Sequence, residues 1–314
     1  MRLRDLGRGQ KFDQLLRIFS RDRHRLPGVL AKANRAALVE QIVESIRRID
    51  FIKAISKRDI SDLRADPSSD LFDPIKAAIL HKRQGHTDEA FWLVFLSVHF
   101  GKHKRAGWRL VRDVYGSLGA AAPWDWARTS SNPRAFRQWL VKSEPLLKGA
   151  DGISRHFGNH RKYQSLDAAS PSGTGAAIES YVKWVGPPRT HEMFIEESQK
   201  KIGKNPRKLF DYLYRSMSEV MSFGRMAKFD YLTMIGKLEL ARIQAGSTYL
   251  EDSTGPLAGA RMLFSGSKTA HLSRQDLDSR SVELGDALGV GMQVVEDALC
   301  NWQKSPGKFV PFRG

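Results

Sequence analysis

The chain has 314 residues and a mass of 35.4 kDa, and its 51 Lys and Arg residues against 34 Asp and Glu residues give a formal net charge of +17. Hydrophobic residues make up 41% of the chain, which excludes wholesale disorder and is enough for one or two compact cores. The single cysteine, Cys300, excludes an intramolecular disulfide framework and a thiolate metal cluster, and it fits a reducing compartment.

The chain shows neither a secretory signal nor a membrane span. Its first residues are charged and lack an apolar segment, and no apolar run reaches the ~20 residues that cross a bilayer. We therefore expect a cytoplasmic protein without membrane contact.

The predicted elements are helical in chain order, and no long run alternates with the period of two that a strand requires. Apolar residues recur at three- and four-residue spacing from Ala37 to Ile46, as in an amphipathic helix. The segment 87–99 is apolar on all sides, which predicts a buried central helix. Asn-Pro pairs at 132–133 and 205–206 are strong helix starts. We predict an all-α fold.

The positive charge lies in two blocks. Residues 1–60 hold 15 basic and 7 acidic side chains (+8), and residues 101–166 hold 13 and 4 (+9). Such blocks are typical of proteins that bind a polyanion, although a solvated surface also produces them. Aromatic residues interleaved with the second block either offer stacking faces for bases or belong to the core. They are Trp108, Tyr115, Trp124, Trp126, Phe136, Trp139, Phe157 and Tyr163.

Two short segments, 99–103 and 156–160, share the pattern His-Phe-Gly-x-His. One interpretation is a metal site, because four imidazoles can bind zinc or iron. No carboxylate accompanies either segment, however, and we expect no metal or cofactor. A second interpretation is that the glycines bring backbone amides close to a phosphate or a base. A third is that these histidines only cap and pack helix ends. The cations expected at a phosphate are Lys102, Arg105, Arg155, Arg161 and Lys162.

Three further segments have the form of anion or catalytic sites. Gly173-Thr174-Gly175 leads into a helix and is either an anion site or an ordinary loop. The turn at Gly224, followed by Arg225 and Lys228, has the form of a helix-hairpin-helix element, as does Leu288-Gly289-Val290-Gly291-Met292. A plain αα-hairpin is the alternative for both.

A carboxylate-bearing segment, residues 249–261, precedes a small-residue helix and contains Asp252. Carboxylates at a helix start are usually caps. The functional alternative is that Asp252 stabilises an oxocarbenium-like sugar and orients water.

Residues of about 85–304 resemble a known family, alpha-glutamyl/putrescinyl thymine pyrophosphorylase clade 3, while the first 60 residues carry none of that signal. The resemblance rests on FWLVFLSVHFGKH, GWRLVRDVYG, PWDW, HFGNHRKYQSL, GTG before SYVKWVG, and FGRMAKFDYLTMIGKL. The family is regarded as an outlying branch of the helix-hairpin-helix DNA glycosylases, linked to phage base hypermodification and anti-phage defence.

The resemblance implies a helix-hairpin-helix glycosylase-like architecture with a basic N-terminal helical region (1–84), a catalytic region (85–305) and a tail (306–314). A soft internal boundary falls near 145–152. The leading hypothesis is a DNA glycosylase that flips out and excises a bulky hypermodified base, such as glucosylated hydroxymethylcytosine, from double-stranded phage DNA. We expect no obligate protein partner.

The resemblance also implies roles for single residues. Asp252 takes the place of the catalytic aspartate, although its spacing from the hairpin is longer and the accompanying histidine is absent. Lys228 lies near the position of the lysine of lyase-active members. The base pocket would comprise His99, Lys102, His103, His156 and His160. The DNA contacts would be Gly224, Arg225, Lys228, Arg105, Arg155, Arg161, Lys162 and Thr174.

Two other functions remain open. One is a transferase that replaces pyrophosphate on modified thymine in DNA with an amino acid or polyamine. Lys102, Arg155 and the histidines would then serve the leaving group and the amine. The other is a DNA-binding protein without catalysis.

Overall fold

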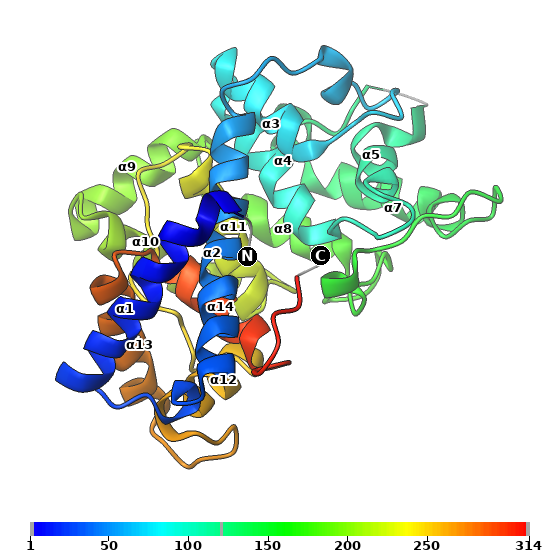
Figure 1. Cartoon of the computed structure of the whole chain (residues 1–314). Helices are drawn as coiled ribbons and strands as arrows, with labels where there is room; N and C mark the ends of the chain where they lie inside the picture. Colours follow the sequence, from blue (N-terminus) through cyan, green and yellow to red (C-terminus); the bar gives the residue numbers. More distant parts are fainter. Residues whose placement is uncertain (1–2, 120–121, 312–314) are drawn as a thin grey trace. The chain divides into compact units, whose positions relative to one another are not determined.

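The computed structural model describes residues 3–119 and 122–311 (Figure 1). Within this part of the chain there are 14 α-helices, several 3-10 turns and no strand, so the predicted all-α class is confirmed. No helix in the described ranges is long and apolar enough to cross a membrane.

The helices divide between two compact units. One unit comprises Met1–Ala54 and Gln244–Arg313, and the other comprises Ile55–Ile243. The first holds α1 (Leu6–Asp22), α2 (Lys32–Ile55), α12 (Gly255–Ser265), α13 (Arg274–Leu288) and α14 (Met292–Trp302). The second holds α3 (Pro74–Arg83), α4 (Thr87–Phe100), α5 (Arg109–Tyr115), α6 (Trp126–Ser131), α7 (Pro133–Leu147), α8 (Thr174–Val185), α9 (His191–Ile202), α10 (Pro206–Ser216) and α11 (Arg225–Lys237).

This division differs from the one that we drew at residue 84, because the N-terminal helices pack with the last three helices. The Trp302 indole donates to the Asn34 carbonyl (3.0 Å), and the Ser45 hydroxyl donates to Asp297 (2.9 Å). At Gly28, an added Cβ would meet the Met262 carbonyl oxygen at 2.2 Å, so the backbone of the short 3-10 helix Pro27–Val29 touches that of α12. Residues far apart in sequence thus share one core.

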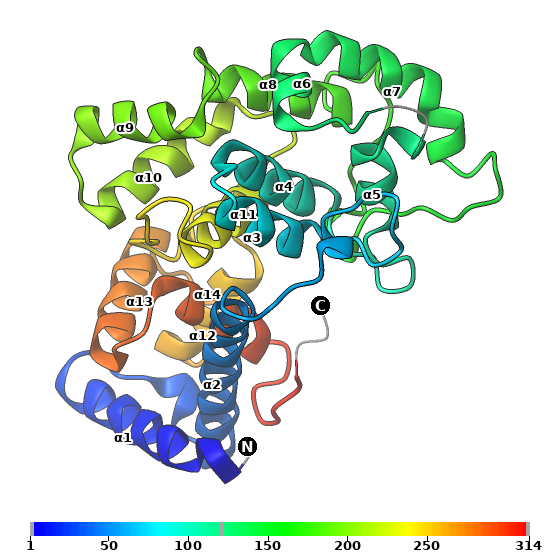
Figure 2. The ribbon, with the colours of Figure 1, turned by 90° about the horizontal axis from the view of Figure 1, so that it is seen from above.

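Helix α4 forms the centre of the second unit, with α3 and α11 beside it (Figure 2). Every side chain from Ala90 to Phe100 is buried, as the all-round apolar pattern predicts. The Phe95 ring stacks on Tyr181 of α8 at a centroid distance of 3.9 Å. This aromatic core holds the loops at the end of α4 in place.

Both predicted Asn-Pro helix starts are present. The side chain of Asn132 accepts a hydrogen bond from the Ala135 amide (3.0 Å) at the start of α7. Asn205 accepts from the amides of Arg207 and Lys208 at the start of α10. Each cap satisfies amides that the first turn leaves without an intrahelical partner.

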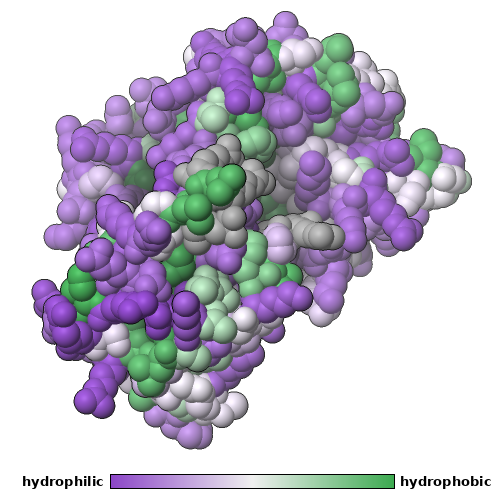
Figure 3. Space-filling model, in the orientation of Figure 1, coloured by the Kyte–Doolittle hydropathy of each residue, from purple (hydrophilic) through white to green (hydrophobic). Residues whose placement is uncertain are grey.

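Hydrophilic side chains dominate the face drawn in Figure 3, and hydrophobic ones form small separate patches between them. With a net charge of +17, this surface presents many cations to solvent. Cations without an internal partner are the ones available to a ligand.

Candidate functional site

The two His-Phe-Gly-x-His segments meet in the second unit. The Gly158 amide donates to the Phe100 carbonyl at 2.8 Å, and the Phe100 and Phe157 rings stack with their centroids 5.6 Å apart. A Cβ on Gly158 would lie 2.8 Å from the carbonyl carbon of Gly101. The middle glycines therefore permit close backbone contact between the two segments, one of which ends α4.

The contact places His103 opposite His156, with ring centroids 4.9 Å apart. Nδ1 of His103 accepts the Ala106 amide at 3.0 Å, so the neutral ring carries its proton on Nε2. Nε2 of His156 lies 2.6 Å from the Ser154 hydroxyl. Partial burial, and then the nearby His156 and Arg105, lower the pKa of His103 below its usual 6.5, which keeps this imidazole neutral at pH 7.

These histidines line an open groove of about 430 Å³. Within the described ranges, Lys104 and Arg105 form no ion pair, and Arg109 makes only a long hydrogen bond to the Ser154 carbonyl (3.3 Å). No carboxylate lines the groove, so its three cations are available to an anion. The lining residues are His103, Lys104, Arg105, Ala106, Arg109, Ser154, His156 and Asn159.

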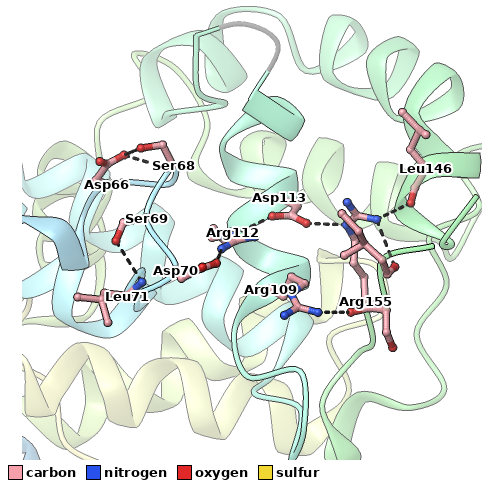
Figure 4. A network of polar contacts seen from close by, with 12 residues as sticks. Asp66, Ser68, Ser69, Asp70, Leu71, Arg109, Arg112, Asp113, Leu146 and Arg155 are labelled. Carbon is pink, nitrogen blue, oxygen red and sulfur yellow. Dashed lines mark hydrogen bonds and ion pairs between the residues drawn. The ribbon is translucent and has the colours of Figure 1, made fainter. Parts of the chain in front are cut away.

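Arg155, between the lining residues Ser154 and His156, belongs to a network of ion pairs (Figure 4). Its guanidinium contacts Asp113 (2.5 Å), Asp151 (2.8 Å) and the Leu146 carbonyl (2.7 Å), and only 3% of its side chain is exposed. The hydrogen bond from Arg155 lowers the pKa of Asp151 to about 2. Arg155 therefore holds the loop that carries Ser154 and His156 in place. This differs from the expected role of Arg155 as a DNA contact, because its guanidinium is buried and paired.

Arg161 is also a structural residue. Its Nε donates to the Val98 carbonyl at 2.6 Å, and its Nη2 lies 2.8 Å from Asp230 of α11. The side chain is buried. This arginine links α4 to α11, and its guanidinium has little surface left for a phosphate.

His99 and Thr174 lie in the core of the unit. The Thr174 hydroxyl donates to the Ser165 carbonyl (2.9 Å) and therefore accepts from Nε2 of His99 (3.0 Å). Burial lowers the pKa of His99 to about 3, so the ring is neutral. It stacks with Phe95 and Phe223. Neither side chain faces the groove.

The other predicted residues of this unit lie on its surface. Lys102 and His160 are exposed. Gly224 caps α11, where Arg225 lies near the Phe229 ring (5.2 Å) and Lys228 near the Tyr214 ring (4.4 Å). Lys162 lies 4.9 Å from the Tyr163 ring centroid.

Asp252 belongs to the other unit, where it occupies an exposed turn shortly before α12. Within the described ranges its carboxylate has no hydrogen bond or ion pair. The same unit contains the Gly-x-Gly hairpin between α13 and α14, in which Gly289 is left-handed (φ 67°) and Gly291 caps α14. This hairpin lines a groove of about 570 Å³ together with Arg8, Lys11, Asp50 and Lys53, and Arg8 pairs with Asp50 at 3.6 Å.

The structure thus brings together part of the predicted set, namely His103, Arg105 and His156. Sequence reasoning missed Lys104, Arg109, Ser154 and Asn159. Arg109 belongs to the same basic run as Arg105, and that run was the available signal. Described residues contain no group of three or more potential metal ligands of the His, Cys, Asp or Glu type.

Within the described residues this is an all-helical protein with a groove whose three cations have no carboxylate partner. The chain matches the family alpha-glutamyl/putrescinyl thymine pyrophosphorylase clade 3 over residues 33–314, and it belongs to that family. The match confirms the resemblance and extends it into α2, where the motifs gave no signal. Neither a curated protein nor a solved structure matches the chain.

Proposed function

We propose that this protein is an enzyme that acts on DNA and replaces pyrophosphate on a modified thymine with an amine. The family name refers to glutamyl and putrescinyl thymine and to a pyrophosphorylase. The observation that carries the proposal is the groove, which combines three cations without carboxylate partners and two facing imidazoles. This is the set of groups that a pyrophosphate leaving group and an attacking amine require.

The reaction is a substitution at the exocyclic methylene carbon of the base. The amine nitrogen forms a bond to this carbon, the bond from carbon to the pyrophosphate oxygen breaks, and one amine proton is released. Pyrophosphate departs with the electron pair of the broken bond. The enzyme must therefore stabilise growing negative charge on phosphate oxygens and accept one proton.

The groove residues suit these two tasks. Arg105 and Arg109 provide planar donors for phosphate oxygens, and Lys104 adds a point charge. His103 donates from Nε2 because its Nδ1 is occupied by the Ala106 amide. His156, which is exposed beside Ser154, is the proposed proton acceptor. Along the rest of the DNA, Lys102, Lys162, Arg225 and Lys228 are proposed backbone contacts.

A second candidate is excision of a hypermodified base by a glycosylase, with a role in anti-phage defence. Its specific support is the exposed Asp252 carboxylate in the unit that also holds the Gly-x-Gly hairpin and its cationic groove. In this scheme Asp252 stabilises the developing sugar cation. The first candidate has the stronger support, because the family name specifies pyrophosphorylase chemistry.

The test is to incubate the protein with matched DNAs that carry thymine, pyrophosphorylated hydroxymethyluracil or glucosylated hydroxymethylcytosine. Glutamate or putrescine is added or withheld. The DNA is then digested to nucleosides, whose masses are measured by mass spectrometry. We expect an amine adduct and pyrophosphate only from the pyrophosphorylated DNA and only with amine. Abasic sites would instead establish the glycosylase, and binding without any product would leave a DNA-binding protein.

Variants connect the outcome to residues. Arg105→Ala combined with Arg109→Ala should reduce adduct formation about 100-fold, as expected for lost donors to a developing anion. Arg134→Ala, an exposed arginine of α7 in the same unit, is the matched control and should retain activity. Asp252→Asn should leave the transferase reaction unchanged but abolish excision if the protein is a glycosylase.

A further inference from the structure

One aromatic side chain of the second basic block differs from the other seven. Those seven are buried or half-buried, as core residues are, whereas Tyr163 is 89% exposed. Its hydroxyl has no hydrogen-bond partner in the described part of the chain. Packing within this chain therefore does not account for the position of this ring.

The surroundings of Tyr163 combine cations with exposed apolar groups. The Lys162 ammonium lies 4.9 Å from the ring centroid. The neighbouring Gln164 side chain donates to the Ser222 carbonyl at 3.1 Å, which brings this loop beside the turn that precedes α11. That turn exposes Met221 (42%), and the first turn of α11 exposes Met226 (43%). An aromatic and thioether surface is thus set among basic residues.

We infer that Tyr163 is a stacking platform for an unpaired base of a nucleic-acid strand. Every base has a π-face that can stack on an exposed ring, and the adjacent phosphate would meet Lys162. Charge complementarity favours a nucleic acid over a protein partner, because the loop carries Lys162 and α11 begins with Arg225. The bound base would cover apolar surface that is now in contact with water.

The platform lies close to the proposed active groove along the chain. Asn159 lines that groove, and four residues on, Tyr163 can be at most about 14 Å away between Cα atoms. A short single strand can therefore contact the groove cations and the ring together. The inference rests on the premise of the proposed function that DNA is the substrate, and it adds that one base beside the groove is unstacked.

The test measures the affinity of the full chain for two labelled single-stranded oligonucleotides of equal length by fluorescence anisotropy. One has bases and the other is abasic, so both present the same phosphates. Tyr163→Ala removes the ring, and Tyr163→Phe keeps it. Phe51→Ala is the matched control, because Phe51 is an exposed aromatic residue (60%) of the other unit.

We expect Tyr163→Ala to weaken binding of the base-containing strand about tenfold, within the range for one lost base stack, and binding of the abasic strand less than twofold. Tyr163→Phe and Phe51→Ala should both bind like the unmodified protein. Equal losses on both strands, or no loss, would overturn the platform while leaving the proposed reaction intact. Failure of the unmodified protein to bind either strand would also overturn the platform, whereas the proposed reaction is judged separately by adduct formation on the pyrophosphorylated DNA.

Discussion

Two regions of the second unit use the same kinds of side chain in opposite ways. In its interior, the Asp88 carboxylate contacts Nδ1 of His191 (2.7 Å), whose Nε2 lies 2.7 Å from the Tyr181 hydroxyl, which in turn lies 2.8 Å from the Tyr231 hydroxyl. Each of these four side chains has a hydrogen-bond partner. Burial lowers the pKa of His191, so that the ring stays neutral.

In the groove, the imidazoles and cations are open to solvent. Arg105 and Lys104 have no carboxylate partner in the described residues, whereas Arg155, which lies between the lining residues Ser154 and His156 in the sequence, has two. Paired charges stabilise the fold, whereas charges left unpaired in a concave surface are available to a ligand. In this unit, the number of internal partners distinguishes structural side chains from candidate ligand-binding side chains better than the residue type does.

Replacement of Arg155 should have the largest effect on stability. Arg155→Ala leaves the Asp113 carboxylate in a buried position with Arg112 as its remaining cation, so we expect the free energy of unfolding to fall by about 3 kcal/mol. Urea denaturation followed by circular dichroism measures this change. Arg105→Ala, the matched groove variant, should change it by less than about 0.5 kcal/mol. Similar losses for both variants would refute the distinction between paired and unpaired charges.

Glu89 should make the interior sensitive to pH. Desolvation raises the pKa of this buried carboxyl from 4.5 to about 7, partly offset by hydrogen bonds from the Trp126 amide and the Tyr115 hydroxyl. Because the raised pKa favours the protonated form, the contribution to stability is complete below pH 4.5 and is lost as pH rises through 7. We expect a loss of about 3 kcal/mol at pH 8, because a pKa change of one unit corresponds to about 1.4 kcal/mol.

Comparing Glu89→Gln with the unmodified protein isolates this effect, because the variant cannot ionise at this position. The difference in urea midpoint between pH 5 and pH 8 should shrink in Glu89→Gln. Glu192→Gln, at an exposed position of α9, should keep the original difference. An unchanged pH dependence in Glu89→Gln would contradict the assignment.

Arginine replacements in the groove should reduce ligand affinity without loss of fold. Arg105→Ala should weaken DNA binding about tenfold at low salt, and the slope of log affinity against log salt should become shallower by about one. Titrations at several salt concentrations measure both quantities. An unaltered slope would mean that Arg105 makes no phosphate contact.

The smallest expected effect concerns His103. Protonation of His103 adds charge to the groove, so phosphate affinity should rise about threefold as pH falls below 6, at a midpoint under the usual histidine value of 6.5 because the pKa of His103 is lowered. The variant His103→Gln should lose this rise. A pH response that persists in His103→Gln would assign the effect to other groups.

Sequence patterns predicted the local features well and the long-range ones poorly. The apolar run of α4 and the Asn-Pro caps are set by neighbouring residues, so both were predictable. The pairing of the chain ends in one unit depends on contacts such as Ser45 with Asp297, which leave no local signal. The same limit applies to Arg155, whose partner Asp113 is distant in sequence, so a block of charge could not show which arginines are already paired.

The proposed reaction requires the groove to bind the phosphates of a pyrophosphate group. Calorimetric titration with pyrophosphate tests this binding most directly. The unmodified protein and Arg134→Ala should bind one equivalent with equal affinity, while Arg105→Ala with Arg109→Ala should bind at least about tenfold more weakly. Equal affinity in all three proteins would contradict the account, because the ligand would then occupy another site.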